Sequence, residues 1–182
     1  MSSFYRRSSY RSVELAVGPA YWPVFGWTML LAFAQTVLVP LLAFRGAVPS
    51  LVSIAVVLYA VRVGARRGAM LALPAGLIED IFAGTGGGWT ISTTLVALLV
   101  GGFSRRMFAD GAFAPSVLCG AAVLARDLLF WTVMRVEGFP PGFAGAHFHT
   151  ALWRALLTAL VAFVWMLLHG RLVTDKTTVE RY

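Results

Sequence analysis

Six long apolar runs, separated by short turns that mostly carry arginine, constrain this chain more than any other feature. A helix needs about 20 residues to cross the hydrocarbon core of a bilayer, and the runs approach or exceed this length. A soluble domain of 182 residues leaves too much surface exposed to bury a 59% share of apolar side chains, and only 13% of the residues are charged. These figures exclude a soluble enzyme, a disordered tail and, with one cysteine, a secreted disulfide scaffold. We therefore predict an all-α polytopic membrane protein with six transmembrane helices, at residues 21–44, 48–63, 68–83, 89–103, 113–133 and 150–169.

The distribution of positive charge predicts the orientation of these helices. The chain has 15 Lys and Arg against 8 Asp and Glu, a net charge of +7. In a soluble protein this excess would point to nucleic acid, but in a membrane protein it follows from the positive-inside rule. With both termini in the cytoplasm, the outer loops carry only Arg45 and Arg135. The cytoplasmic segments then carry Arg6, Arg7, Arg11, Arg62, Arg66, Arg67, Arg105, Arg106, Arg171, Lys176 and Arg181.

The domain organisation predicted from this pattern is simple. Residues 1–20 form a basic, aromatic-bearing cytoplasmic tail that would lie on anionic lipid, so the predicted partners include membrane lipids and no nucleic acid. A single transmembrane domain covers residues 21–170, and residues 171–182 form a cytoplasmic C-terminal tail. The second, third and fourth runs are short, so a re-entrant or broken pair, and five full spans rather than six, remain alternatives.

Ionisable residues inside the predicted spans are the first candidates for function, because burying a charge in lipid is costly. Counting from the span ends places all of them in the outer half of the membrane. Pairing Asp80 with Arg126 or Arg154 would offset much of this cost. Three alternatives stay open: a salt-bridge cluster that only fixes packing, a site for a partner helix, and a small-ligand pocket. The predicted buried polar cluster comprises Gln35, Glu79, Asp80, Arg126, Asp127 and Arg154.

Small residues recur every four positions along the third predicted span and beyond it. Four consecutive members of such a series share one helix face, where small side chains let two helix backbones approach closely. We predict a groove there that packs either against a partner or within the protein itself. Its residues are Gly68, Ala72, Gly76, Asp80, Gly84 and Gly88.

Catalytic and metal-binding motifs are missing from the sequence. The glycine-rich segment at residues 84–88 is not followed by Lys-Ser/Thr, so it is not a nucleotide-binding loop. His147 and His149 lack further nearby ligands and are interpreted as interfacial residues. We therefore predict no catalytic residues, no metal and no cofactor.

The segment around the third predicted span carries a recognisable pattern. It fits Gly-x-x-x-Asp-x-x-x-Gly-x-x-x-Gly, preceded by the basic turn Arg66-Arg67-Gly68, and its motif positions are Gly76, Asp80, Gly84 and Gly88. This element resembles the signature of the rod shape-determining MreD family. The length, the short loops and the predicted topology are also similar to that family. The chain departs from the family pattern at Glu79, where an apolar residue is usual, and at Gly86-Gly87, where bulkier residues are common.

The resemblance implies a fold like that of the substrate-binding subunits of energy-coupling-factor transporters. It also implies a non-enzymatic subunit of the cell-elongation complex in the bacterial inner membrane, which controls cell shape and lateral peptidoglycan synthesis. The direct partner would be MreC, with MreB, RodZ, RodA and a class B penicillin-binding transpeptidase reached through it. A vitamin-binding subunit of such a transporter is the alternative function. A membrane enzyme acting on a lipid headgroup, with Glu79 or Asp127 as acid or base, is a third.

Overall fold

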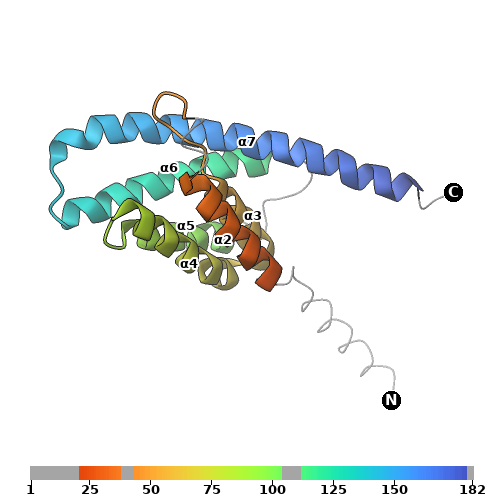
Figure 1. The fold of residues 1–182 in the computed structure, drawn as a ribbon. Helices are drawn as coiled ribbons and strands as arrows, with labels where there is room; N and C mark the ends of the chain where they lie inside the picture. Colours follow the sequence, from red (N-terminus) through yellow and green to blue (C-terminus); the bar gives the residue numbers. More distant parts are fainter. Residues whose placement is uncertain (1–20, 38–42, 104–111, 180–182) are drawn as a thin grey trace, which may run out of the picture.

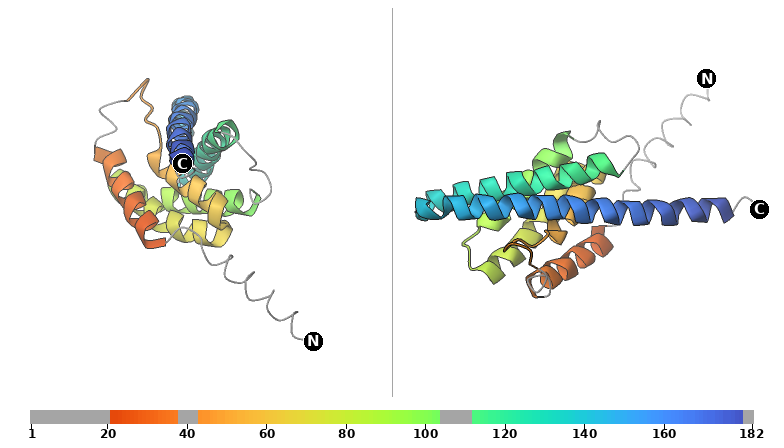
Figure 2. Two further views of the ribbon diagram at one scale, coloured as in Figure 1. Left: turned by 90° about the vertical axis from the view of Figure 1, so that its right-hand side faces the viewer. Right: turned by 90° about the horizontal axis from the view of Figure 1, so that it is seen from above.

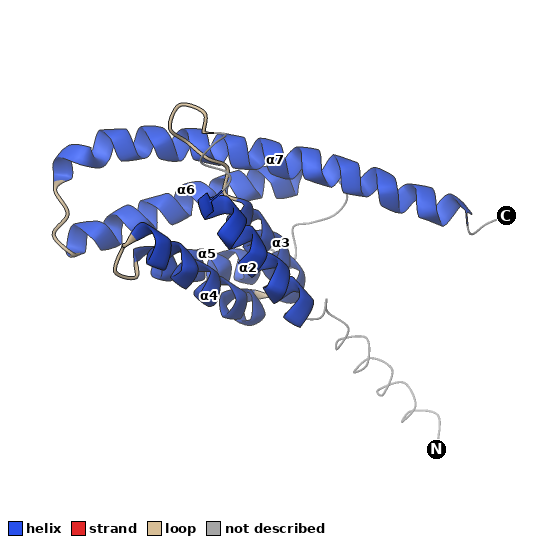
Figure 3. Cartoon of the chain, in the orientation of Figure 1, coloured by secondary structure: helices blue, strands red, loops and turns tan. Residues whose placement is uncertain are grey.

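A computed structural model describes residues 21–37, 43–103 and 112–179 of the chain. In these residues the fold is all-helical, as predicted, and apart from one isolated bridge between Phe44 and Ala47 it contains no β-structure (Figures 1 and 3). Each of the six predicted spans corresponds to one α-helix. The elements are α2 (Tyr21–Val37), α3 (Leu51–Val63), α4 (Ala65–Ala83), α5 (Gly88–Phe103), α6 (Phe113–Val136), the short 3-10 helix η3 (Pro141–Phe143) and α7 (Ala144–Val179).

The helix ends follow from local sequence. Ser50 caps the start of α3, because its side chain accepts a hydrogen bond from the Ser53 amide at 3.3 Å. Gly64 separates α3 from α4 with a φ of +90°, and Gly84 ends α4 in the left-handed conformation with a φ of +66°. Both positions need positive φ, which glycine adopts without steric cost.

Two predicted boundaries differ from the structure. Helix α7 begins at Ala144 and continues to Val179, so the predicted break between a span ending near 170 and a tail at 171–182 is not a helix end. Gly170 lies inside α7, and no proline follows it to stop the helix. Helix α2 is described only to Val37, and residues 43–50 form a turn rather than the end of the first span.

Helices α6 and α7 form a long antiparallel hairpin, and α2 to α5 pack along one side of it (Figure 2). The turn after α4 and the turn after α6 meet at one end of the molecule, where the Glu137 carboxylate faces Gly86. The turn at residues 43–50 reaches α7 near that end, with the Phe44 and Trp153 rings 5.6 Å apart. The α3–α4 turn contacts Gly101 near the end of α5. Successive helices from α3 to α7 therefore alternate in direction.

Helix α3 lies at the centre of the core, because its opposite faces contribute to two apolar clusters. One joins α3 to α2, α4 and α5 through Val52, Val56 and Tyr59. The other joins α3 to α5, α6 and α7 through Ile54 and Val57. Most of their partners are small side chains, chiefly alanines, and small side chains allow close helix approach. The core partners from other helices are Ala32, Leu71, Ala72, Ala75, Ala97, Val96, Val100, Cys119, Ala122 and Ala162.

Large apolar side chains cover much of the outside of the described helices. On α4, Met70, Leu73, Leu77 and Ile81 are all about half exposed or more. Two segments are long and apolar enough to cross a membrane, α6 and the stretch Pro141–Leu168, and α3 and α5 are shorter apolar helices. An apolar exterior over a core of small residues is the arrangement expected where lipid is the solvent.

The contact between α5 and the α3–α4 turn gives a first test. A Cβ at Gly101 would lie 2.5 Å from the Ala65 backbone nitrogen, whereas a Cβ at Gly102 would meet nothing within 4 Å. We expect Gly101→Ala to lower the free energy of unfolding by about 1–3 kcal/mol, because backbone atoms must move to admit the methyl group. Gly102→Ala, its neighbour on the same helix, should be neutral or slightly stabilising. Thermal unfolding in detergent compares the two, and equal stabilities would contradict the packing described here.

Candidate functional site

Arg126 on α6 is the centre of a buried ionic cluster. Its Nη1 donates hydrogen bonds to both carboxylate oxygens of Glu79 on α4, at 3.2 and 3.0 Å. Gln35 on α2 donates to the same carboxylate from Nε2 at 2.9 Å, and its Oε1 accepts the amide of Val52 at the start of α3 at 3.1 Å. Arg126 is 3% exposed and Glu79 is 7% exposed. One cation therefore connects four helices through two polar side chains.

Asp127, the next residue along α6, pairs with Arg154 of α7. Nη1 of Arg154 donates to both carboxylate oxygens of Asp127, at 3.2 and 3.0 Å, and Asp127 is fully buried. Nε of Arg126 lies 3.8 Å from Oδ1 of Asp127, which is near enough for an ion pair but too far for a hydrogen bond. The charges of Glu79, Arg126, Asp127 and Arg154 therefore alternate along a chain and sum to zero.

Aromatic rings form one wall of the cluster. The guanidinium carbons of Arg126 and Arg154 lie 4.6 and 5.7 Å from the centroid of the Trp89 ring, at cation–π distances. Phe130 stacks on Trp89 with the ring centroids 3.8 Å apart. His147 of α7 stacks near Phe130, and its Nε2 lies 3.1 Å from the backbone oxygen of Asp127. The sequence places Trp89 near a span end, where we expect an interfacial residue, but its ring packs between helices.

Asp80 does not join the ionic cluster, so the predicted pairing of Asp80 with Arg126 or Arg154 is wrong. Its Oδ1 accepts hydrogen bonds from the Thr85 hydroxyl at 2.7 Å and the Trp89 amide at 2.9 Å. Its Oδ2 accepts from the Thr90 amide at 2.8 Å and the Thr90 hydroxyl at 2.6 Å. Neighbouring positions on a helix point about 100° apart, so Glu79 faces α6 while Asp80 faces the start of α5. Asp80 thus caps α5 and fastens the α4–α5 turn.

The small-residue series packs within the chain, so of the two predicted roles the structure shows the intramolecular one. A Cβ at Gly68 would lie 2.5 Å from Cβ of Ala60, and one at Gly76 would lie 2.6 Å from Cα of Thr90. Ala72 is fully buried in the core. Helices α3 and α5 already fill this face, so the structure shows packing within the protein and not the alternative of a bound partner.

The last two members of the series leave this face, because helix α4 ends at Ala83. Gly84 is its C-cap, and a Cβ there would meet nothing within 4 Å, while Gly88 begins α5. A Cβ at Gly88 would lie 2.9 Å from the ring of Phe130 on α6. Gly88 therefore permits close approach between α5 and α6 rather than extending the groove along α4.

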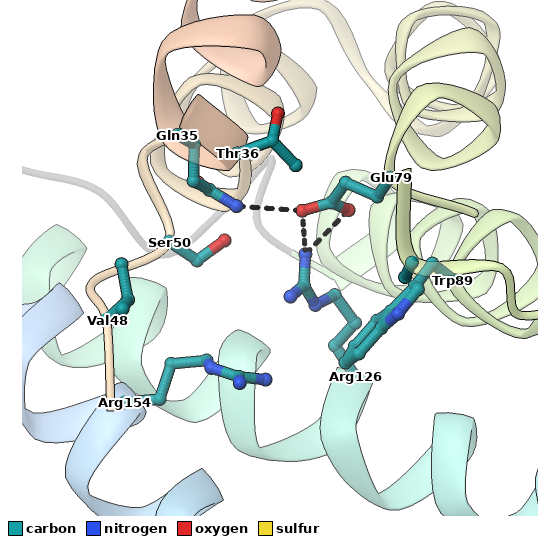
Figure 4. A pocket seen from close by; sticks show the side chains of 9 residues that line it. Gln35, Thr36, Val48, Ser50, Glu79, Trp89, Arg126 and Arg154 are labelled. Carbon is teal, nitrogen blue, oxygen red and sulfur yellow. Dashed lines mark hydrogen bonds and ion pairs between the residues drawn. The ribbon is translucent and has the colours of Figure 1, made fainter. Parts of the chain in front are cut away.

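A cavity of about 200 Å³ opens beside the ionic cluster. Its walls come from α2, the turn before α3, α4, α5, α6 and α7 (Figure 4). A second cavity of about 370 Å³, between the α4–α5 turn and the α6–α7 hairpin, is lined mainly by aromatic and other apolar side chains and has no lining Arg, Lys, Asp or Glu. The first cavity is lined by Gln35, Thr36, Val48, Ser50, Glu79, Ala83, Trp89, Arg126 and Arg154.

The structure brings together five of the six residues predicted for the polar cluster and separates Asp80 from them. Sequence reasoning missed the role of Trp89 and the ligands of Asp80, Thr85 and Thr90. The threonines near the start of α5 could have indicated these contacts, because hydroxyl groups near the start of a helix often form hydrogen bonds with neighbouring backbone or side-chain groups. Among the described residues, no group of three or more His, Cys, Asp and Glu is placed to hold a metal ion.

Comparisons with known proteins add no assignment to this geometry. No family model, no curated protein and no solved structure matches the chain. The interpretation of the site therefore depends on its residues and their contacts.

The Glu79–Arg126 pair gives a second test. Glu79→Ala leaves a buried guanidinium without its main partner, and we expect it to lower the free energy of unfolding by about 3–5 kcal/mol. Glu79→Ala combined with Arg126→Leu removes both charges and should be markedly less destabilising than the single change. The matched control is Glu137→Ala at an exposed carboxylate, which should stay within about 0.5 kcal/mol of the parent. Additive effects in unfolding experiments would contradict direct pairing.

The Asp80 contacts give a third test. Asp80→Asn keeps the size of the side chain but replaces one acceptor oxygen by a donor, which leaves one backbone amide of α5 unpaired. We expect a loss of about 1–3 kcal/mol and faster protease cleavage in residues 84–88. Thr85→Val removes only one of the four hydrogen bonds and should cost about 1 kcal/mol. Unchanged cleavage in Asp80→Asn would show that this carboxylate does not fasten the turn.

Proposed function

We propose that this protein is a non-enzymatic, multi-pass subunit of the bacterial cell-elongation complex, and that it binds MreC in the inner membrane with both its termini in the cytoplasm. The observation that carries the proposal is the internal use of the motif. The aspartate of the MreD-like element accepts four hydrogen bonds within the α4–α5 turn, and two of its glycines make close helix contacts. A motif that fixes the shape of a helical hairpin suits a structural subunit.

The ionic cluster supports a structural role in the same way. Both oxygens of Glu79 and both oxygens of Asp127 accept hydrogen bonds from arginine, and Asp127 is fully buried. A general acid or base must reach its substrate within hydrogen-bonding distance. Carboxylates that are held bidentately between helices favour a rigid support over an enzyme acting on lipid headgroups.

The size of the cavity at the ionic cluster favours a structural subunit over a vitamin-binding transporter subunit. Pockets that enclose drug-sized molecules usually measure about 300–1,000 Å³. The cavity lined by Arg126 and Arg154 measures about 200 Å³. A vitamin bound at the ionic cluster would need a larger space or a rearrangement of the ion pairs, and the cavity of about 370 Å³ is lined by no charged side chain.

The partner surface must differ from the small-residue face, because that face is buried. Helix α4 presents the opposite face outward, with Met70, Leu77 and Ile81 exposed by 58%, 49% and 69%. In a membrane this stripe meets either lipid or a partner helix. We propose that MreC packs on it and so contacts the same helix that carries the motif.

Site-specific photocrosslinking tests the proposal. A photoreactive amino acid is placed at Met70, Leu77 or Ile81 in cells that also produce MreC. We expect crosslinks to MreC from these α4 positions, and depletion of the protein should make rod-shaped cells round.

Leu156 and Leu160 on α7, which are 54% and 59% exposed, are the matched controls on a different face. Adducts with lipid alone at every α4 position, together with normal cell shape after depletion, would refute the proposed function. Equal MreC crosslinking from α4 and α7 would refute the proposed surface only.

A further inference from the structure

The walls of the cavity beside the ionic cluster carry an excess of positive charge, although the cluster as a whole is neutral. Arg126, Arg154 and Glu79 line the cavity, whereas Asp127, the carboxylate that pairs with Arg154, does not. The wall therefore carries two guanidinium groups and one carboxylate. Figure 4 shows the guanidinium group of Arg126 turned toward Glu79, with that of Arg154 below it.

The two arginines also keep hydrogen-bond donors unused. Among the described residues, every hydrogen bond that their side chains make is donated by Nη1. Nε of Arg126 is buried, lies 3.8 Å from Oδ1 of Asp127 and has no hydrogen-bond partner. A guanidinium has five N–H donors, and a buried donor left unpaired is costly. This is the opposite of a cluster whose donors are all satisfied internally.

From these observations we infer that the cavity binds one phosphate group, supplied either by a lipid headgroup or by a free phosphate. A tetrahedral phosphate has enough acceptor oxygens to bridge two guanidinium forks, and arginine recognises phosphate in this bidentate way. The second N–H of Gln35 Nε2, whose first is donated to Glu79, is a further donor at the rim. The small volume admits a headgroup phosphate while attached chains remain outside.

The charge of the site explains why the ligand is an anion and not a cation. The only carboxylate in the cavity wall is Glu79, and both of its oxygens are already held by Arg126. The face of Trp89 is within cation–π distance of both guanidinium groups, so it adds no further attraction for a ligand cation. This site does not depend on the partner proposed above, and a failure of either proposal leaves the other standing.

Binding is tested on the full chain, purified in a neutral detergent and stripped of lipid. Inorganic phosphate is titrated at constant ionic strength against chloride, with the melting temperature and calorimetry as readouts. In parallel, the protein is placed in nanodiscs of phosphatidylcholine with and without phosphatidylglycerol. The test variant combines Arg154→Gln with Asp127→Asn, because the two changes remove one cation and one anion and keep the cluster neutral. The matched control is Arg45→Gln, an exposed arginine at the same end of the molecule that does not line the cavity.

We expect the parent and Arg45→Gln to bind phosphate with affinities within about twofold, and the double variant to bind at least tenfold more weakly. Stabilisation by phosphatidylglycerol but not by inorganic phosphate, lost in the double variant, would identify the headgroup as the source. If the double variant fails to fold, Arg154→Lys, which keeps the charge but loses the planar fork, should still weaken binding several-fold. No response to either phosphate source, an equal response in the variants, or a response to acetate alone would overturn the inference.

Discussion

A guanidinium buried between carboxylates of two helices fixes how this molecule is assembled. Arg126 is held by Glu79 on one side and lies beside Asp127 on the other, and Asp127 in turn holds Arg154. Each charge is too costly to bury alone, so α4, α6 and α7 must meet at the register where all of them pair. Apolar contacts alone would allow one helix to slide or rotate against another. The chain of ion pairs prevents this movement, and the hydrogen bonds of Gln35 extend the same constraint to α2 and α3.

A second constraint acts at one end of this cluster. Both carboxylate oxygens of Asp80 accept hydrogen bonds from backbone amides of α5, and these bonds fix the α4–α5 hairpin. Glu79, one residue earlier, pairs with Arg126 and so fixes the contact between α4 and α6. Gly76 allows the two backbones of that hairpin to touch. The two adjacent acidic residues therefore have different roles: Asp80 fixes a local turn, and Glu79 joins distant parts of the chain. The ion pair with Arg126 gives the acidic residue at position 79 a physical role.

The side chains of the site fall into two sets: carboxylates whose oxygens all accept hydrogen bonds, and arginines that have N–H donors without a partner among the described residues. The carboxylates are held by two or more donors each, which suits a rigid support for other proteins. The arginines are only partly used: both line a small cavity, and Nε of Arg126 is buried without a hydrogen-bond partner. The proposed scaffold would combine both properties, because a bound phosphate group would tie the assembled helices to the lipid around them or to a soluble anion.

The sequence by itself determined the helical class, the positions of the six α-helices in the part of the chain that the structure describes, and five members of the polar cluster. The physical reason is that lipid leaves few options: an apolar run must be helical, and a charge within it must turn inward to find a partner. Which charges pair was decided only by the tertiary structure. Glu79 and Asp80 are both acidic and adjacent in sequence, so their side chains differ in direction by one residue's rotation around α4. Which of them faces α6 depends on how α4 is rotated about its own axis, and that rotation is set by packing across the whole core. The same holds for the small-residue face of Gly68 and Gly76, whose spacing promises a close helix contact but cannot say whether the helix that fills it belongs to this chain or to another.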